Sequence, residues 1–120
     1  MPMRFLQSMN YKVKFTQPAI DDLDDIYSYY ETELSKTSAD KVMKSLREAT
    51  NLLTFSPEGG IDFNKRIGQE VIQGQSLRMF VAQQYLIFYI VVHSEVRIMR
   101  IISTKTNYMN ELENLFKNFK

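Results

Sequence analysis

The stretch YLIFYIVVHSEVRIMRI, residues 85–101, holds two apolar runs separated by the short polar pair His93-Ser94. Such a pattern predicts a β-hairpin, and successive side chains of a strand point to opposite faces of the sheet. Both faces of the first predicted strand are apolar, with Leu86, Phe88, Ile90 and Val92 on one and Tyr85, Ile87, Tyr89 and Val91 on the other. A sheet in a small domain commonly leaves one face to water, so this hairpin predicts cover on both faces.

The segments before the hairpin predict a strand followed by two helices. Residues 11–16 alternate apolar and polar side chains, as a half-buried strand does, and Pro18 then occupies a first helical position. Apolar residues follow at helical spacing as far as Leu34. Thr37 or Ser38 is the expected N-cap of a second helix, which ends near residue 55 because Ser56-Pro57 cannot continue it.

The remaining segments complete an α+β fold. Residues 61–76 predict an irregular or weakly extended stretch, and residues 77–81, 85–92 and 95–103 predict a three-strand meander. A C-terminal helix is expected from an apolar stripe at Tyr108, Leu112, Leu115, Phe116 and Phe119. The predicted architecture is therefore an antiparallel helical hairpin packed on an antiparallel sheet. The hairpin of residues 18–55 is the expected cover of one sheet face, with the C-terminal helix over part of the other.

Length and composition indicate one domain without metal or disulfide chemistry. The 120 residues suffice for a single core, expected over residues 11–120, and residues 1–10 are predicted to be a flexible arm. One histidine and no cysteine argue against a zinc site or a disulfide framework. The net charge is only +1, but residues 65–120 carry eight Lys and Arg against four Asp and Glu, so an acidic partner is expected to prefer this half.

Two segments resemble the RelE/ParE superfamily of toxins from bacterial type II toxin–antitoxin systems. The opening YKVKFTQPAIDDLDDIYSYY, residues 11–30, is similar to the start of these toxins. LRMFVAQQYLIFYIVVHSEVRIMRI, residues 77–101, resembles the ParE-type pattern of Leu-Arg-x-Phe, a Tyr-x-Ile-Phe-Tyr strand, a polar turn and Val-x-Ile-x-Arg-Ile. The resemblance covers roughly residues 11–110 and implies the same α+β fold.

The resemblance implies a cytoplasmic protein that disables a cellular target and is held inactive by a cognate antitoxin. ParE-type toxins poison DNA gyrase, whereas RelE-type toxins enter the ribosome and cleave mRNA. A third alternative is a degenerate member that retains only antitoxin binding. No cofactor and no metal are expected for any of the three, and the ParE type is the favoured interpretation.

The residues that RelE-type toxins use for cleavage are largely missing from this chain. Those toxins commonly carry an arginine just after the first tyrosine of the Tyr-x-x-x-Tyr strand, where this chain has Leu86. They also carry basic residues or a His-Tyr pair after the last strand. The remaining catalytic candidates are Arg78, Lys105 and Tyr108. This reduced set favours a binding protein over a nuclease.

Other polar residues have simpler interpretations than catalysis. His93 is the one imidazole, but it is expected at a hairpin tip, which lacks neighbours that tune a catalytic pKa. Four aspartates within residues 21–25 are expected in the first turns of a helix, where the helix dipole favours negative charge. Tyr27, Tyr29 and Tyr30 could stack on bases, but two of the three, Tyr27 and Tyr30, fall on the predicted core stripe of the helix, so core packing is the favoured role.

Two arginines stand out because they share predicted strand faces with apolar residues. Arg78 lies on the face of Phe80, and Arg100 on the face of Val96, Ile98 and Ile102. A buried arginine needs a carboxylate or a partner, so an internal salt bridge and a binding role both remain open. The residues expected to contact the target or the antitoxin are Arg78, Phe80, Tyr85, Tyr89, Arg100 and Lys105.

Overall fold

A five-stranded sheet in the order β1-β5-β4-β3-β2 forms the centre of the computed structural model, which describes residues 11–119. The strands are β1 (Lys12–Phe15), β2 (Ile61–Asp62), β3 (Arg78–Ala82), β4 (Tyr85–Val92) and β5 (Glu95–Ser103). The predicted meander β3-β4-β5 and the α+β class are confirmed. Two details differ from the prediction, since β1 pairs with β5 in parallel and β2 adds a two-residue strand. The predicted arm, residues 1–10, lies outside the described residues.

Two long helices, α2 (Gln17–Glu33) and α3 (Lys36–Phe55), follow β1 and form the predicted hairpin. The hydroxyl of Thr16 caps α2 by accepting from the N–H of Ala19 at 3.3 Å. The cap of α3 is Ser35, which accepts from the N–H of Ser38 at 3.1 Å. The predicted caps of the second helix were therefore wrong, because Ser35 already has extended dihedrals and the helix begins one residue later.

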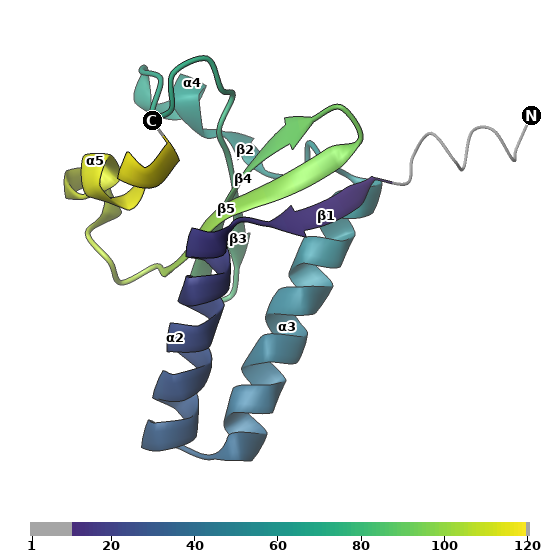
Figure 1. The fold of residues 1–120 in the computed structure, drawn as a ribbon, viewed down its shortest axis with the longest axis vertical. Helices are drawn as coiled ribbons and strands as arrows, with labels where there is room; N and C mark the ends of the chain where they lie inside the picture. Colours follow the sequence, from purple (N-terminus) through teal and green to yellow (C-terminus); the bar gives the residue numbers. More distant parts are fainter. Residues whose placement is uncertain (1–10, 120) are drawn as a thin grey trace, which may run out of the picture.

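The helical hairpin covers one face of the sheet and projects beyond it. Figure 1 shows α2 and α3 running side by side away from the strands. Their apolar sides and the helix-facing strand residues form one buried cluster, hereafter the helix-side core: Ala19, Leu46, Ala49, Leu53, Ile87, Tyr89, Val96, Ile98 and Ile101. Among residues 11–119 no helix has the length and apolarity needed to cross a membrane.

The chain itself covers the second face, with two segments that join over β4. The segment predicted to be irregular contains a short helix, α4 (Phe63–Ile67), and the predicted C-terminal helix is instead three short turns, η1 (Tyr108–Asn110), α5 (Leu112–Leu115) and η2 (Lys117–Phe119). No side-chain cap supports η1 or α5, so packing against the sheet holds these turns in place. Figure 1 shows α4 and α5 on the side of the sheet away from the helical hairpin.

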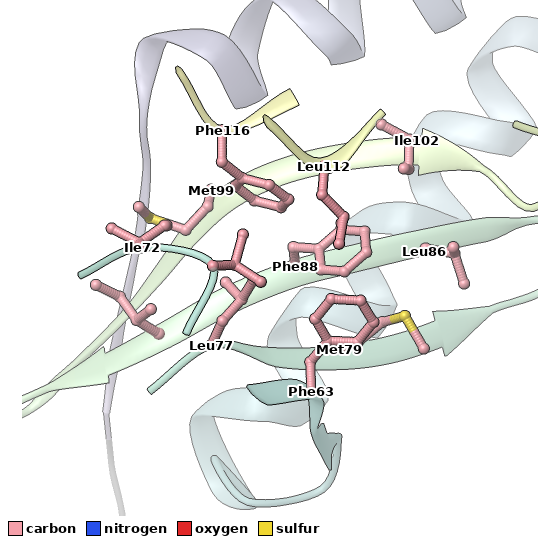
Figure 2. Close-up of a cluster of buried hydrophobic side chains, with 12 residues drawn as sticks. Phe63, Ile72, Leu77, Met79, Leu86, Phe88, Met99, Ile102, Leu112 and Phe116 are labelled. Atoms are coloured by element: carbon pink, nitrogen blue, oxygen red, sulfur yellow. The ribbon is translucent and has the colours of Figure 1, made fainter. Parts of the chain in front are cut away.

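Aromatic rings fill the space beneath these two segments. The ring of Phe88 on β4 meets Phe63 and Phe116 edge to face, with centroids 5.1 and 5.3 Å away, an arrangement favoured by the ring quadrupoles. Figure 2 shows these rings within a buried cluster, hereafter the outer core, whose labelled members also include Ile72, Leu77, Met79, Leu86, Met99, Ile102 and Leu112. Both apolar faces of the opening stretch are therefore buried within the monomer.

A β-bulge in β5 changes which face its residues occupy. Phe88 lies opposite Arg100 and Tyr89 opposite Ile98, so Met99 is an extra residue in the ladder. Ile98 and Ile101 consequently both pack in the helix-side core, while Met99 and Ile102 pack in the outer core. The prediction that Arg100 shares a face with Val96, Ile98 and Ile102 is confirmed for Ile102, because Phe88 and Leu86, which lie opposite Arg100 and Ile102, both belong to the outer core. It was wrong for Val96 and Ile98, because strict alternation does not continue through a bulge.

The guanidinium of Arg100 lies at the sheet edge just beyond the end of β1 and joins three layers. Its Nε and Nη2 each donate to a carboxylate oxygen of Asp22 on α2 at 2.8 Å, and its Nη1 donates to the carbonyl of Leu115 at 2.8 Å. Asp22 also accepts from the backbone N–H of Ile101 at 2.9 Å. The hydrogen bonds to the Asp22 carboxylate raise the pKa of Arg100 further above its usual value. The pair thus ties the helical hairpin, the sheet and the C-terminal segment together.

The acidic cluster at the start of α2 owes little to the helix dipole. The helix begins at Gln17, and no acidic residue falls in its first turn, whereas the dipole effect fades beyond that turn. The predicted reason for the cluster was therefore wrong. Asp22 is buried as the partner of Arg100, and Asp21, Asp24 and Asp25 are exposed.

Replacing Arg100 by leucine is expected to lower the free energy of unfolding by roughly 3 kcal/mol, because it leaves the buried carboxylate of Asp22 without its partner. The matched control is Arg97→Leu, which removes an exposed pair with Glu95 on the same strand and is expected to change stability by about 0–1 kcal/mol. Urea unfolding of both full-length variants measures the difference. Equal losses in the two variants would show that the Arg100 pair does not link the layers.

Candidate functional site

Two of the predicted binding residues, Tyr85 and Lys105, meet at a groove between α2 and the end of the sheet. The groove, hereafter the tyrosine groove, has a volume of about 540 Å³. It is lined by Asp25, Ile26, Tyr29, Tyr30, Leu34, Gln84, Tyr85, Ser103 and Lys105. Its size lies in the range of sites that bind ligands or peptide side chains.

The sheet wall of the groove is held by hairpin geometry. Tyr85 opens β4 directly after a tight turn in which Gln83 has a φ of 57°, and it lies opposite Ser103 on β5. The N–H of Thr104 donates to the carbonyl of Gln84 at 2.8 Å, and the N–H of Lys105 donates to the hydroxyl of Ser103 at 3.1 Å. The backbone of Lys105 is thereby fixed beside Tyr85 while its ammonium group stays exposed.

The helical wall of the groove has apolar side chains that remain exposed in the monomer. Tyr29 and Leu34 are 62% and 65% exposed, and the rings of Tyr29 and Tyr30 meet edge to face at 5.5 Å. Of the two tyrosines expected on the core stripe, Tyr30 lines this groove instead, and neither Tyr27 nor Tyr30 belongs to a buried cluster of the described residues. Tyr29 was already expected to lie off the stripe, because the three tyrosines span more than one side of a helix.

The electrostatics of the tyrosine groove suit binding by neutral aromatic groups. Burial in the first place, and the neighbouring Tyr30 hydroxyl in the second, raise the pKa of the Tyr85 phenol far above its usual value. The phenol therefore stays protonated at physiological pH and acts as a hydrogen-bonding group rather than as a base. Asp25 and Lys105 supply one carboxylate and one ammonium group to the lining. The groove thus offers aromatic surface, hydroxyl groups and two opposite charges.

Tyr89 and Phe80, two other predicted binding residues, both pack with the helix-side core. Tyr89 is fully buried; its hydroxyl donates to the carbonyl of Pro57 at 2.7 Å and accepts from the N–H of Gly60 at 2.9 Å. A Cβ on Gly60 would lie 2.8 Å from that hydroxyl, so the close approach requires glycine. Phe80 is half-buried against the helix-side core. Both residues therefore hold the fold in place.

The two prominent arginines differ in how their charge is compensated. Arg100 is paired with Asp22, whereas Arg78 donates through Nη2 to the carbonyls of Gly60 at 2.7 Å and Glu58 at 3.3 Å. Among the described residues Arg78 forms no salt bridge with a carboxylate, and its buried Nε has no hydrogen-bond partner. Arg78 thus anchors the turn before β2, and its positive charge has no paired carboxylate there.

The remaining catalytic candidates do not come together at one place. The ring of Tyr108 packs near Phe63 and Phe88 over the outer core, on the sheet face opposite the tyrosine groove. His93 occupies the hairpin tip as predicted, with a φ of 55°. It lies at the other end of β4 from Tyr85, roughly 25 Å away along the strand. Across residues 11–119 no group of three or more His, Cys, Asp or Glu side chains is arranged to hold a metal ion.

Comparison with known proteins identifies the class to which this fold and groove belong. The model of the family described as ParE toxin of type II toxin-antitoxin system, parDE, matches residues 13–108. The chain belongs to the ParE toxin family of type II toxin–antitoxin systems. A search of curated proteins found no match. The family match confirms the predicted toxin class. Membership of this family also implies a protein antitoxin as partner.

A solved structure supports the same fold. The chain is similar to one from the chromosomal ParDE toxin–antitoxin system of P. aeruginosa, with a TM-score of 0.62 and 21% sequence identity. The match covers 80% of this chain and 97% of the other. At this level of identity the comparison establishes the arrangement of helices and strands, and the roles of individual side chains rest on the geometry above.

Tyr89→Phe and Tyr85→Phe form a matched pair that distinguishes a hydroxyl needed for the fold from a hydroxyl that only lines the groove. Tyr89→Phe leaves the Pro57 carbonyl and the Gly60 N–H without their buried partner and is expected to lower the free energy of unfolding by about 1–3 kcal/mol. Tyr85→Phe, at the half-buried groove, is expected to cost less than about 1 kcal/mol. Chemical denaturation of both variants tests this. Equal destabilisation would mean that the Tyr85 hydroxyl is as structural as that of Tyr89.

Proposed function

We propose that this chain is a toxin that inhibits DNA gyrase by binding to it in the cytoplasm, and that its antitoxin prevents this binding. Membership of the ParE family supports the proposal. The chain's own residues favour binding over cleavage, since the tyrosine groove contains no histidine and its central tyrosine stays protonated. Metal-independent RNA cleavage needs a base, an acid and cations around one phosphate.

One observation carries the choice between gyrase inhibitor and nuclease. Leu86 stands where RelE-type toxins commonly carry an arginine, and it is 4% exposed within the outer core. The segment that begins with α4 and the C-terminal turns η1, α5 and η2 cover that sheet face with aromatic and aliphatic side chains. A phosphate could reach this face only after the core had opened, which is unfavourable because each large buried side chain contributes about 1.5–3 kcal/mol of burial energy.

The tyrosine groove is the surface proposed to contact gyrase. The few positions that dominate a protein interface are enriched in tyrosine. Tyr29 is such a candidate, since it is exposed and lines the groove together with the exposed Lys105. Tyr85 and Lys105 are favoured among the residues predicted for binding, because Tyr89 is buried, Phe80 packs on the helix-side core and Arg100 is paired internally.

A supercoiling assay with purified gyrase and relaxed plasmid tests the proposal. The intact chain is expected to inhibit supercoiling and to trap cleaved plasmid, and Tyr29→Ala with Lys105→Ala is expected to raise the inhibitory concentration at least about tenfold. Leu52→Ala is the matched control, because Leu52 is 60% exposed on α3, away from the groove. Unimpaired supercoiling at excess intact chain would rule out gyrase as the target.

The nuclease alternative has a separate readout. Primer extension on cellular mRNA during growth arrest is expected to show no new cleavage sites at translated codons. Codon-spaced cleavage that disappears in a Lys105→Ala variant would overturn the proposal and identify a ribosome-dependent nuclease instead.

A further inference from the structure

The guanidinium of Arg78 has a charge and N–H donors that the described residues leave uncompensated. A guanidinium carries N–H donors on each of its nitrogens, and in residues 11–119 only those of Nη2 have acceptors, the carbonyls of Gly60 and Glu58. Nε is buried without a hydrogen-bond partner, and no carboxylate of these residues forms a salt bridge with Arg78. Because a half-buried charge without a counter-charge is unfavourable, Arg78 is suited to an anion from outside the chain.

A small hollow opens beside this guanidinium, where the turn after α3 passes the strands. The hollow, hereafter the Arg78 hollow, has a volume of about 150 Å³. It is lined by Tyr11, Pro57, Glu58, Ser76, Arg78 and Val91. Pockets that take whole drug-sized ligands usually measure about 300–1,000 Å³. The Arg78 hollow therefore has room for one acidic group rather than for a whole nucleotide.

Hydrogen bonds within the chain hold the lining of the hollow in place. The buried hydroxyl of Tyr89 fixes the turn at residues 57–60 from the sheet side, and that turn in turn accepts from Nη2 of Arg78. The backbone N–H of Tyr11 donates to the carbonyl of Thr54 at 3.2 Å, which fixes Tyr11 beside the end of α3. A site that is formed in advance loses little conformational entropy when it binds a ligand.

The groups around the hollow suit an oxyanion. Nη1 of Arg78 makes no hydrogen bond within residues 11–119 and remains able to donate, and Tyr11 and Ser76 add hydroxyl-bearing side chains to the lining. Carboxylate and phosphate oxygens accept charge-assisted hydrogen bonds from a guanidinium, which are about twice as strong as neutral ones. Glu58 adds a carboxylate to the lining, but its side chain is exposed and forms no salt bridge with Arg78.

We propose that the Arg78 hollow binds a small oxyanion, a carboxylate or a phosphate group, with Arg78 as the residue that contributes most to binding. The oxyanion supplies the counter-charge that Arg78 lacks within the described residues, and the hydroxyl groups of Tyr11 and Ser76 donate to its other oxygens. Because Arg78 also holds the carbonyls of residues 58 and 60, the bound oxyanion strengthens the connection between α3 and β2. A cation is repelled by the guanidinium, and an apolar ligand leaves its charge unpaired.

The Arg78 hollow is separate from the tyrosine groove. The two sets of lining residues share no member, and Val91 of the hollow and Tyr85 of the groove lie at opposite ends of β4. The inference depends on neither gyrase nor the antitoxin, so its failure leaves the gyrase proposal untouched, and the reverse also holds.

Proton–nitrogen NMR of the full-length chain, titrated with sodium phosphate and separately with sodium acetate at constant ionic strength, tests the inference directly. The Nε–H resonance of Arg78 and the backbone amide of Ser76 are expected to shift and to saturate with a Kd on the order of 1 mM, the range of a few charge-assisted hydrogen bonds at a site open to solvent. The Nε–H of Arg97, already paired with Glu95, is the internal control and is expected not to shift. The anion that binds more tightly identifies the preferred group, and the absence of a saturable shift with both anions would overturn the proposal.

Substitutions in the lining supply a second test. Arg78→Gln is expected to weaken binding of the preferred anion at least about tenfold, whereas Arg97→Gln, which removes the same charge from an exposed position, leaves the affinity unchanged. Glu58→Gln removes a negative charge from the lining and is expected to strengthen binding about twofold to fivefold. Glu58 is exposed and its side chain makes no hydrogen bond within the described residues, so this variant tests the site without the loss of turn contacts that Arg78→Gln brings. Equal affinities of Arg78→Gln and the intact chain, or weaker binding by Glu58→Gln, would contradict the proposal.

Discussion

The ion pair between Arg100 and Asp22 is the interaction on which the arrangement of layers depends. Arg100 lies just beyond the end of β1, where β5 has no neighbouring strand on that side among the described residues, and Asp22 accepts hydrogen bonds from both the guanidinium and the buried N–H of Ile101. The third contact, to Leu115, reaches the segment that covers the opposite face. A charged pair with side chains only 20% and 11% exposed needs this complete set of hydrogen bonds. The bulge at Met99 turns Arg100 toward these partners and so makes the set possible.

Closure of both sheet faces has a direct consequence for function. The face toward η1, α5 and η2 is filled with aromatic and aliphatic groups, and the helical hairpin covers the other, so neither sheet face is free to bind a partner directly. The tyrosine groove, the surface proposed to contact gyrase, lies at the end of the β3–β4 hairpin beside α2.

The residue types at the tyrosine groove fit the role proposed for it. The groove presents neutral hydroxyls and exposed rings, which bind varied apolar and polar groups. Arg78, whose charge has no carboxylate partner among the described residues, is held by carbonyl groups of the turn at residues 58–60, so it stabilises that turn.

The sequence by itself determined the order of elements, the α+β class and the burial of both faces of β4, because these follow from periodicity within short segments. The family resemblance in residues 77–101 likewise followed from local pattern. Tertiary structure alone decided which sheet face each residue of β5 occupies beyond Met99, because a bulge depends on how two strands pair. It also decided that Ser35 caps α3, that the C-terminal stripe breaks into short turns, and that Arg100 pairs internally. Tyr29 and Lys105 are distant in sequence and became neighbours only through the packing of α2 on the sheet, which no local pattern records.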